Sequence, residues 1–361
     1  MPFLVADAVH EPLYAVVPYF NPWRWKTREK HTVRALKHYH DSGATIVFVE
    51  IAFNRRDFAF EDLGLDGTYA DCGIHDKRYQ HKHIKLRTTG ELWLKENAIN
   101  LGVGSLTYDW QQVCWLDADV HFLRPNWVGE CIHKLQHYKF LQMFSHARDL
   151  SPEYEMLPED YPHADGISWM EGYEQGVLPT KGTLTAGDYY GAWSMVGGKP
   201  ARRVWPGLAW ACTRQAWDEV GGLPDIAVWG GGDWHMSHAL IERREGMMDP
   251  GLHPHYQAII NEWYDKCQRE IRRNVGQMKG SVAHYWHGRK SERGYAAKHR
   301  ALAKFGFDPL RHLKRDMQGL WQLHDDGSEA YIQMRDTMRR IALERNEDSP
   351  EIILPIFQNN H

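Results

Sequence analysis

The distribution of apolar residues predicts a buried sheet in the first part of the chain. Residues 13–19 read Leu-Tyr-Ala-Val-Val-Pro-Tyr, and residues 44–53 form a second, nearly continuous apolar run. Residues 27–42 lie between these runs and are predicted to be a helix that ends at Gly43. Strands with no polar face are typical of parallel sheets covered on both sides, and the order strand, helix, strand indicates an α/β domain.

The remaining pattern is less regular. A helix is predicted over 91–101, ending at Gly102, and a buried strand over 113–116. Residues 151–206 are rich in Gly, Pro, Asp and Tyr, which predicts loops and short strands. A helix is expected over 213–220, and residues 291–361 show helical spacing of apolar side chains, which predicts a C-terminal helical extension.

Composition narrows the class of protein. The chain has 361 residues, of which 43% are hydrophobic and 25% charged, so it can bury a large core. Its formal charge of -4 excludes a globally basic nucleic-acid coat. Five cysteines without a CxxC pair, no secretory signal and no long apolar run predict a cytoplasmic protein without a membrane span.

Asp117 and Asp119 follow the strand predicted at 113–116. Residues two apart on a strand point to the same face, so both carboxylates can reach one hard cation and the ribose of a nucleotide. Such a pair is a weak signal alone, because aspartates at strand ends often cap turns. Apolar residues flank the pair on both sides, and uncompensated charge is unfavourable there, which favours a bound cation.

Two further segments carry candidate chemistry. His284 and His287 can complete a cation site on a tight loop, and carboxylate with imidazole suits Mn(II) or Mg(II), although a chain with 22 histidines contains such pairs by chance. Residues 229–234 read Trp-Gly-Gly-Gly-Asp-Trp, where the glycines permit close approach of a ligand and Asp233 can act as a general base. A plain turn with an Asp cap explains the second segment equally well.

The order of these motifs resembles that of the GT-A fold glycosyltransferases, particularly the galactosyltransferase-like and polypeptide N-acetylgalactosaminyltransferase-like branches. The resemblance covers roughly residues 13–295, and its most specific part is the R-x-A-x-x-x-x-G-G-x-x-D stretch at 214–225. It implies a Rossmann-like nucleotide-sugar-binding domain over 1–290 with a mixed, mostly parallel central sheet. The donor half would span about 12–125, the acceptor half about 126–290, and the helical extension 291–361.

The resemblance also implies roles for individual residues. Asp119 would be the principal metal ligand, Asp117 a metal or ribose contact, His284 and His287 further metal ligands, and Asp233 the base that deprotonates the acceptor. The nucleotide, taken to be UDP, would contact Pro18, Tyr19, Asn21, Asp117 and Arg289. The acceptor would contact Trp229, Gly231, Gly232 and Trp234. The family has acids beside its base where this chain has Gly232 and Trp234, so the acceptor and the inverting stereochemistry are less firmly implied.

The function expected from the sequence is therefore transfer of a sugar from a nucleotide-sugar donor to an acceptor hydroxyl, in a bacterial or phage protein. A glycan or glycoconjugate is the default acceptor. A hydroxymethylated pyrimidine in phage DNA is the alternative, because residues 286–315 hold nine Lys and Arg and residues 23–37 hold six more. A nucleotidyltransferase or a non-catalytic sugar-binding protein are alternatives of other classes.

Overall fold

The computed structural model describes residues 11–61, 80–157, 164–178, 193–196, 199–288 and 290–350. Its central sheet has seven strands in the order β12-β6-β11-β4-β1-β2-β3. Within the described residues, every strand of this sheet runs in one direction except β11, which is antiparallel to both β4 and β6. The strands are β1 (Leu13–Phe20), β2 (Thr45–Phe53), β3 (Lys82–Thr88), β4 (Gln112–Leu116), β6 (Phe140–Gln142), β11 (Ala209–Thr213) and β12 (Val275–Gln277).

A second sheet adjoins the first and was not predicted from the sequence. Its order is β5-β13-β7-β8-β10-β9. The strands are β5 (Val120–Phe122), β7 (His146–Asp149), β8 (Asp165–Ser168), β9 (Trp193–Val196), β10 (Lys199–Trp205) and β13 (Ser281–His284). The chain passes from the first sheet to the second through residues 117–119, between β4 and β5.

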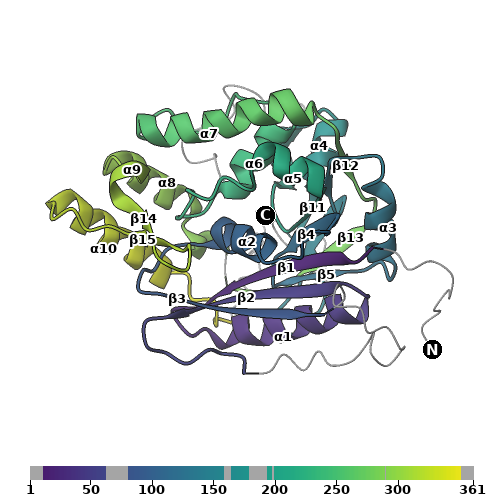
Figure 1. Ribbon diagram of the computed structural model, residues 1–361, viewed down its shortest axis with the longest axis horizontal. Helices are drawn as coiled ribbons and strands as arrows, with labels where there is room; N and C mark the ends of the chain where they lie inside the picture. The colour runs from purple at the N-terminus through teal and green to yellow at the C-terminus, as the bar shows by residue number, and fades with distance from the viewer. Residues whose placement is uncertain are drawn as a thin grey trace, which may run out of the picture.

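Helices cover the central sheet on both faces (Figure 1). The α-helices of the described chain are α1 (Lys26–Asp41), α2 (Lys95–Gly104), α3 (Trp127–Lys134), α4 (Trp169–Glu174), α5 (Arg214–Val220), α6 (Gly232–Leu240), α7 (Pro254–Lys266), α8 (Tyr295–Lys304), α9 (Pro309–His312) and α10 (Glu329–Leu343); the last three belong to the C-terminal extension.

Strand β1 explains the layered arrangement. Its side chains alternate, so Leu13, Ala15 and Val17 belong to the core on the α1 side, while Tyr14 and Val16 belong to the core on the α2 side. All five are at most 2% exposed. The continuous apolar run of the sequence is therefore a strand buried on both faces, and the predicted α/β class with a mixed, mostly parallel sheet is confirmed.

The predicted elements agree with the structure within one or two residues, except for α2. This helix begins at Lys95 rather than at residue 91, because the backbone N–H of Trp93 donates to the carbonyl of Val228 at 2.7 Å. It continues past Gly102 to Gly104. A glycine is needed at 102, since a Cβ there would lie 2.6 Å from Cγ1 of Val16 on β1.

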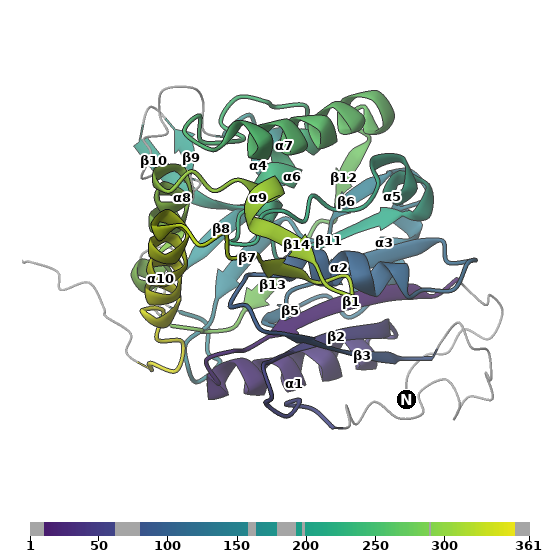
Figure 2. The ribbon, with the colours of Figure 1, turned by 60° about the vertical axis from the view of Figure 1, so that its left-hand side comes forward.

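The C-terminal extension combines α8, α9 and α10 with a pair of strands, β14 (Leu313–Arg315) and β15 (Trp321–Leu323). Helices α8 and α10 pack against each other at one end of the molecule (Figure 2). The residues at helical spacing in the sequence, Tyr331, Met334, Met338 and Ile341, are all buried on α10. The chain then continues into Arg345 and Glu347, which are also buried.

The described cysteines form no disulfide. The four described cysteines, Cys114, Cys131, Cys212 and Cys267, are buried and free, and Cys72 lies outside the described residues. No helix in the described part of the chain combines the length and the apolar character needed to cross a membrane.

Replacing Gly102 by alanine is expected to destabilise the fold by about 1–3 kcal/mol, because the new methyl group overpacks the contact of α2 with β1 and β2. Urea unfolding measures the change. Gly104→Ala is the matched control on the same helix, where an added Cβ meets nothing within 4 Å. Equal stability of the two variants would contradict the packing described here.

Candidate metal and substrate site

The candidate site lies where the two sheets meet. Asp117 and Asp119 occupy the connection from β4 to β5. Strand β13 pairs with β5 in a register that places His284 opposite Val120, and the backbone N–H of Tyr285 donates to the carbonyl of Asp119 at 2.8 Å. This pairing brings the end of β13 beside Asp119, although about half of the chain separates the two segments.

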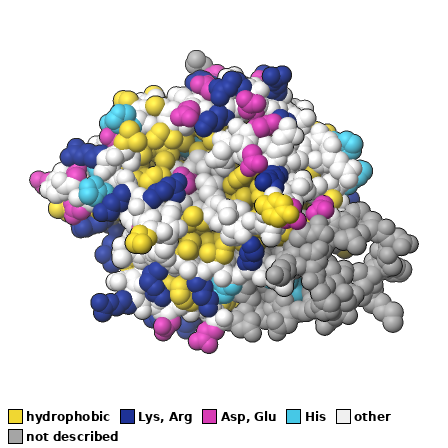
Figure 3. Space-filling view, in the orientation of Figure 1, with side chains coloured by type: hydrophobic (Ala, Val, Ile, Leu, Met, Phe, Trp, Pro, Cys, Tyr) yellow, Lys and Arg dark blue, Asp and Glu magenta, His cyan; other side chains and the backbone are white. Residues whose placement is uncertain are grey.

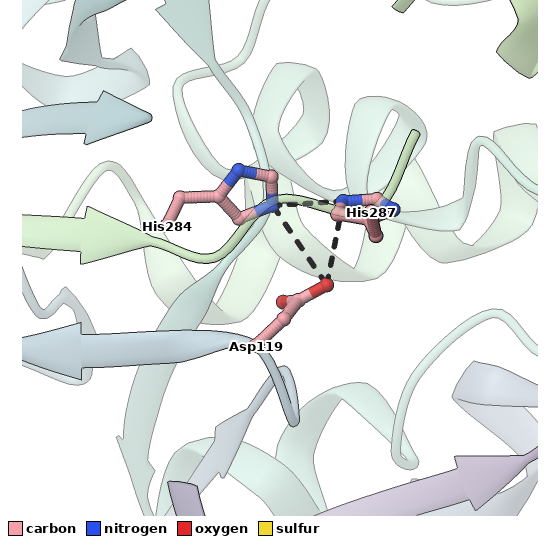
Figure 4. Close-up of side chains that lie close together, drawn as sticks. All are labelled: Asp119, His284 and His287. Atoms are coloured by element: carbon pink, nitrogen blue, oxygen red, sulfur yellow. Dashed lines mark hydrogen bonds and ion pairs between the residues drawn. The ribbon is translucent and has the colours of Figure 1, made fainter. Parts of the chain in front are cut away.

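Asp119, His284 and His287 converge on one point (Figure 4). Oδ2 of Asp119 lies 3.4 Å from Nε2 of His287 and 3.8 Å from Nε2 of His284. The two Nε2 atoms are 3.1 Å apart. His284 ends β13, and His287 follows in the loop, so the tight-loop arrangement expected from their spacing is present.

The chemistry of these three groups fits a divalent cation. Nδ1–H of His284 donates a hydrogen bond to Oδ1 of Asp149 at 2.6 Å, which leaves the lone pair of the ring on Nε2. Burial lowers the pKa of His287 well below its usual value, and the charge of Arg293 adds to the effect, so this ring is neutral. Oδ1 of Asp119 is buried without a hydrogen-bond partner among the described residues. With Nε2 of His287 unprotonated as well, the carboxylate and the two imidazoles offer electron pairs to one point, a ligand set that suits Mn(II) or Mg(II).

Asp117 is held apart from this triad. Its Oδ1 lies 2.5 Å from Nζ of Lys95, at the start of α2. Burial alone would lower the pKa of Lys95, but the charges of Asp117 and Asp233 outweigh burial and raise it. Lys95 therefore stays charged beside Asp117, whose predicted contact with a metal or a ribose remains a prediction.

Asp233 lies in the first turn of α6 and lines the same cleft. The backbone N–H of Trp234 donates to its Oδ1 at 2.9 Å. Its other oxygen lies against Gly207, where a Cβ would come within 2.3 Å. Gly231, at φ 93°, starts the helix from a left-handed conformation that favours glycine. The backbone thus fixes the direction of the Asp233 carboxylate.

A second carboxyl group, from Glu96, stands next to Asp233. Glu96 is 5% exposed and lines the cleft. A Cβ on Gly232 would lie 2.3 Å from its Cδ, so the missing side chain at 232 makes room for Glu96. Burial raises the pKa of Glu96 to about 8 against the opposing charge of Lys95, and Asp233 adds to the rise. Glu96 is therefore mostly protonated at neutral pH.

The cleft contains most of the residues that the sequence singled out. Those that line it are Pro18, Tyr19, Asp117, Asp119, Trp229, Gly231, Asp233, Trp234, His284 and His287. Trp234 is 2% exposed, and its indole N–H donates to the carbonyl of Gly246, so most of this ring belongs to the core.

Two predicted residues are not among those that line the cleft, and a third is not described. Asn21 closes a turn with Trp25 by two hydrogen bonds, and its amide also donates to the hydroxyl of Tyr19 at 3.2 Å. Gly232 faces Glu96 in a small adjoining cavity. Arg289 lies outside the described residues.

The sequence reasoning missed the cationic end of the cleft. Besides Lys95 and Glu96, the lining includes Arg28, Trp93, Arg203, Arg293, Lys298, Arg345 and Glu347. The signal in the sequence was the excess of Lys and Arg in residues 23–37 and 286–315, which was interpreted as a possible DNA-binding surface. Their positions in the sequence could not show that Arg28, Arg293 and Lys298 face inward.

Comparisons with known proteins leave the family open. No protein-family model and no curated protein matches the chain. The catalytic domain of Drosophila β1,4-galactosyltransferase 7, in complex with xylobiose, aligns at 12% identity and TM-score 0.29, over 63% of this chain and 60% of that one. The chain therefore spans less than two thirds of that structure.

Two bacterial structures align over a greater length. One, named as a nucleotide-diphospho-sugar transferase of Desulfovibrio desulfuricans, has 10% identity and TM-score 0.32 over 92% of this chain and 98% of that one. Glucosyl-3-phosphoglycerate synthase of Mycobacterium tuberculosis, in complex with Mg2+ and UDP, has 10% identity and TM-score 0.31 over 87% of each chain. Similarity this distant assigns neither family nor activity, so the function has to be argued from the site.

Asp149→Asn is expected to weaken Mn(II) binding by roughly 10- to 100-fold, because the amide no longer fixes the ring and lone pair of His284. Isothermal titration with MnCl2 measures the affinity. Asp165→Asn, which changes an exposed carboxylate on the neighbouring strand β8, is the control and should bind as the unchanged protein does. Unaltered binding by Asp149→Asn would contradict its role in orienting His284.

Proposed function

We propose that the protein is a metal-dependent glycosyltransferase that moves a sugar from a nucleoside-diphosphate sugar, with UDP as the nucleotide, to an acceptor hydroxyl. The observation that carries the proposal is the convergence of Asp119, His284 and His287 in the cleft that Asp233 also lines. A cation ligand set and a fixed carboxylate are the two groups that such a transfer requires. The resemblance of the motifs to GT-A enzymes agrees with this proposal.

One set of residues is proposed to bind the donor and its leaving group, and another the acceptor. Asp119, His284 and His287 would hold Mn(II) or Mg(II), which would act as a Lewis acid on the departing diphosphate. Lys95 adds a fixed positive charge next to Asp117. Pro18 and Tyr19, at the end of β1, line the same cleft and are proposed to contact the nucleoside. The carboxyl ends of parallel strands are where α/β sheets bind ligands.

Asp233 is proposed as the general base. Its carboxylate would accept the proton of the acceptor hydroxyl as that oxygen bonds to the anomeric carbon. The bond between the anomeric carbon and the phosphate oxygen breaks at the same time, and the nucleoside diphosphate leaves with the electron pair. A single displacement of this kind inverts the configuration. The contacts to Trp234 and Gly207 keep the carboxylate oriented for it.

A sugar hydroxyl is favoured over a DNA base as the acceptor. Three cations of the basic stretches, Arg28, Arg293 and Lys298, line the cleft instead of an outer face. Acidic and basic side chains are interspersed on the face shown in Figure 3. Trp229 lines the same cleft as Asp233, and its aromatic ring is proposed to contact the acceptor sugar. We therefore propose a glycan or glycoconjugate as the acceptor.

Asp119→Asn is expected to abolish measurable Mn(II) binding and Mn(II)-dependent UDP binding, because the triad loses its anionic ligand. Asp117→Asn is the matched comparison on the same connection and should keep Mn(II) binding, since Asp117 pairs with Lys95. Isothermal titration of both variants measures the difference. Equal losses in the two variants would contradict the division of roles between the two aspartates.

Asp233→Asn is expected to keep UDP and Mn(II) binding and to lower transfer by roughly 100-fold or more, because the amide cannot accept a proton. A panel of nucleotide sugars with Mn(II), scored first for slow donor hydrolysis, identifies the donor and supplies the assay. Asp218→Asn on α5, whose side chain is 63% exposed, is the control. An unchanged rate of sugar transfer in Asp233→Asn would show that Asp233 is not the general base.

The same assay separates the other classes of protein. A nucleotidyltransferase would release pyrophosphate rather than UDP, and a sugar-binding protein would release neither.

A further inference from the structure

Lys298 is a buried basic side chain that makes no ion pair and no hydrogen bond in the part of the chain that the structure describes. It lies on α8, is 9% exposed and lines the cleft. Its ammonium group is 5.5 Å from the ring centre of Trp93. An ammonium group has three N–H donors, and a buried charge without a partner is strongly unfavourable. An anionic ligand in the cleft could therefore accept hydrogen bonds from Lys298 and stabilise its charge.

Two arginines approach the same indole ring. The guanidinium carbons of Arg28 and Arg345 lie 5.5 Å and 5.3 Å from the ring centre of Trp93. Burial lowers the pKa of Lys298 to about 7; the charges of Arg345 and Arg28 add to the effect, and the charge of Glu347 opposes it. Three cations thus gather over one aromatic ring from three separate segments of the chain.

Glu347 forms ion pairs with two of these three side chains. Arg28 binds it through two N–H groups, at 2.9 Å and 2.6 Å, and NH2 of Arg345 lies 2.9 Å from Oε1 of the same carboxylate. That oxygen is 4.0 Å from Nδ1 of His287, whose other ring nitrogen faces Asp119. The cluster is therefore adjacent to the proposed metal ligands, on the side formed by the C-terminal extension.

We propose that Lys298, Arg345 and Arg28 form a phosphate-binding subsite next to the metal triad, with two of its three cations supplied by the C-terminal extension. Guanidinium and ammonium groups are the side chains that bind phosphate oxygens best, and the planar guanidinium can donate two parallel hydrogen bonds. The phosphate belongs either to the diphosphate of the donor or to a phosphorylated acceptor. This choice rests on the proposed function, whereas the subsite itself does not.

The test is isothermal titration of inorganic pyrophosphate into the full chain in EDTA, so that no metal contributes to binding. Lys298→Met and Arg345→Gln are expected to bind pyrophosphate at least tenfold more weakly, because each removes a charged donor. Lys304→Met, at the exposed end of the same helix α8, is the matched control and should bind normally. Thermal unfolding of each variant checks the fold, and Lys298→Met decides the outcome if Arg345→Gln does not fold.

Unchanged affinity in Lys298→Met, or no pyrophosphate binding by the unaltered chain at millimolar concentration, would overturn the proposal. Titrations of UDP and of glucose 6-phosphate distinguish the two sources. Weaker UDP binding by Lys298→Met assigns the subsite to the donor. Weaker glucose 6-phosphate binding with normal UDP binding assigns it to the acceptor.

The two proposals can fail separately. If pyrophosphate binding depends on Lys298 but no nucleotide sugar is hydrolysed with Mn(II), the subsite stands and the glycosyltransferase proposal falls. If nucleotide sugars are hydrolysed and pyrophosphate binding does not depend on Lys298, the reverse holds.

Discussion

The register between β5 and β13 is the constraint on which the candidate site depends. It places His284 opposite Val120, and the hydrogen bond from Tyr285 to the carbonyl of Asp119 continues the pairing past the end of the strand. Side chains alternate along a strand, so a slip of one residue would turn His284 to the other face of the sheet. The contact of His284 with Asp149 would be lost with it. The pairing of β13 with β5 thus brings His284 to Asp119, and the pairing of β13 with β7 places Asp149, which orients the ring, opposite His284.

Much of the central fold could be predicted because its signals are local. The apolar runs of β1 and β2 and the cap of α5, where Thr213 accepts from Ala216 and Gly221 is left-handed, are each visible within a few residues. The second sheet was missed as a unit because its described strands are short and β13 pairs with β5 and β7, which lie far from it in the sequence. The start of α2 was missed because Trp93 bonds to a residue far along the chain, and no local pattern records that contact.

The residues of the candidate site also fall into those that local sequence indicates and those that only packing reveals. The acidic pair, the two histidines and Asp233 could be predicted, because each carries a recognisable spacing. Lys95 and Glu96 could not, since they are ordinary helix residues until packing brings Lys95 to Asp117 and Glu96 into the space beside Gly232. The sequence has a glycine at position 232, where the GT-A motif that it resembles carries an acid. The structure has a carboxyl group there, from another element.

The C-terminal extension supplies basic side chains to the cleft. The acids Asp117, Asp119 and Asp233 line the same cleft as the three basic side chains that gather over Trp93. A substrate with a neutral sugar and an anionic phosphate would match this combination of groups. Arg345 and Lys298 then act as part of the cleft wall, and the ion pair of Arg28 with Glu347 fastens the extension to α1. The extension is in this respect a component of the binding site as well as a helical addition to the fold.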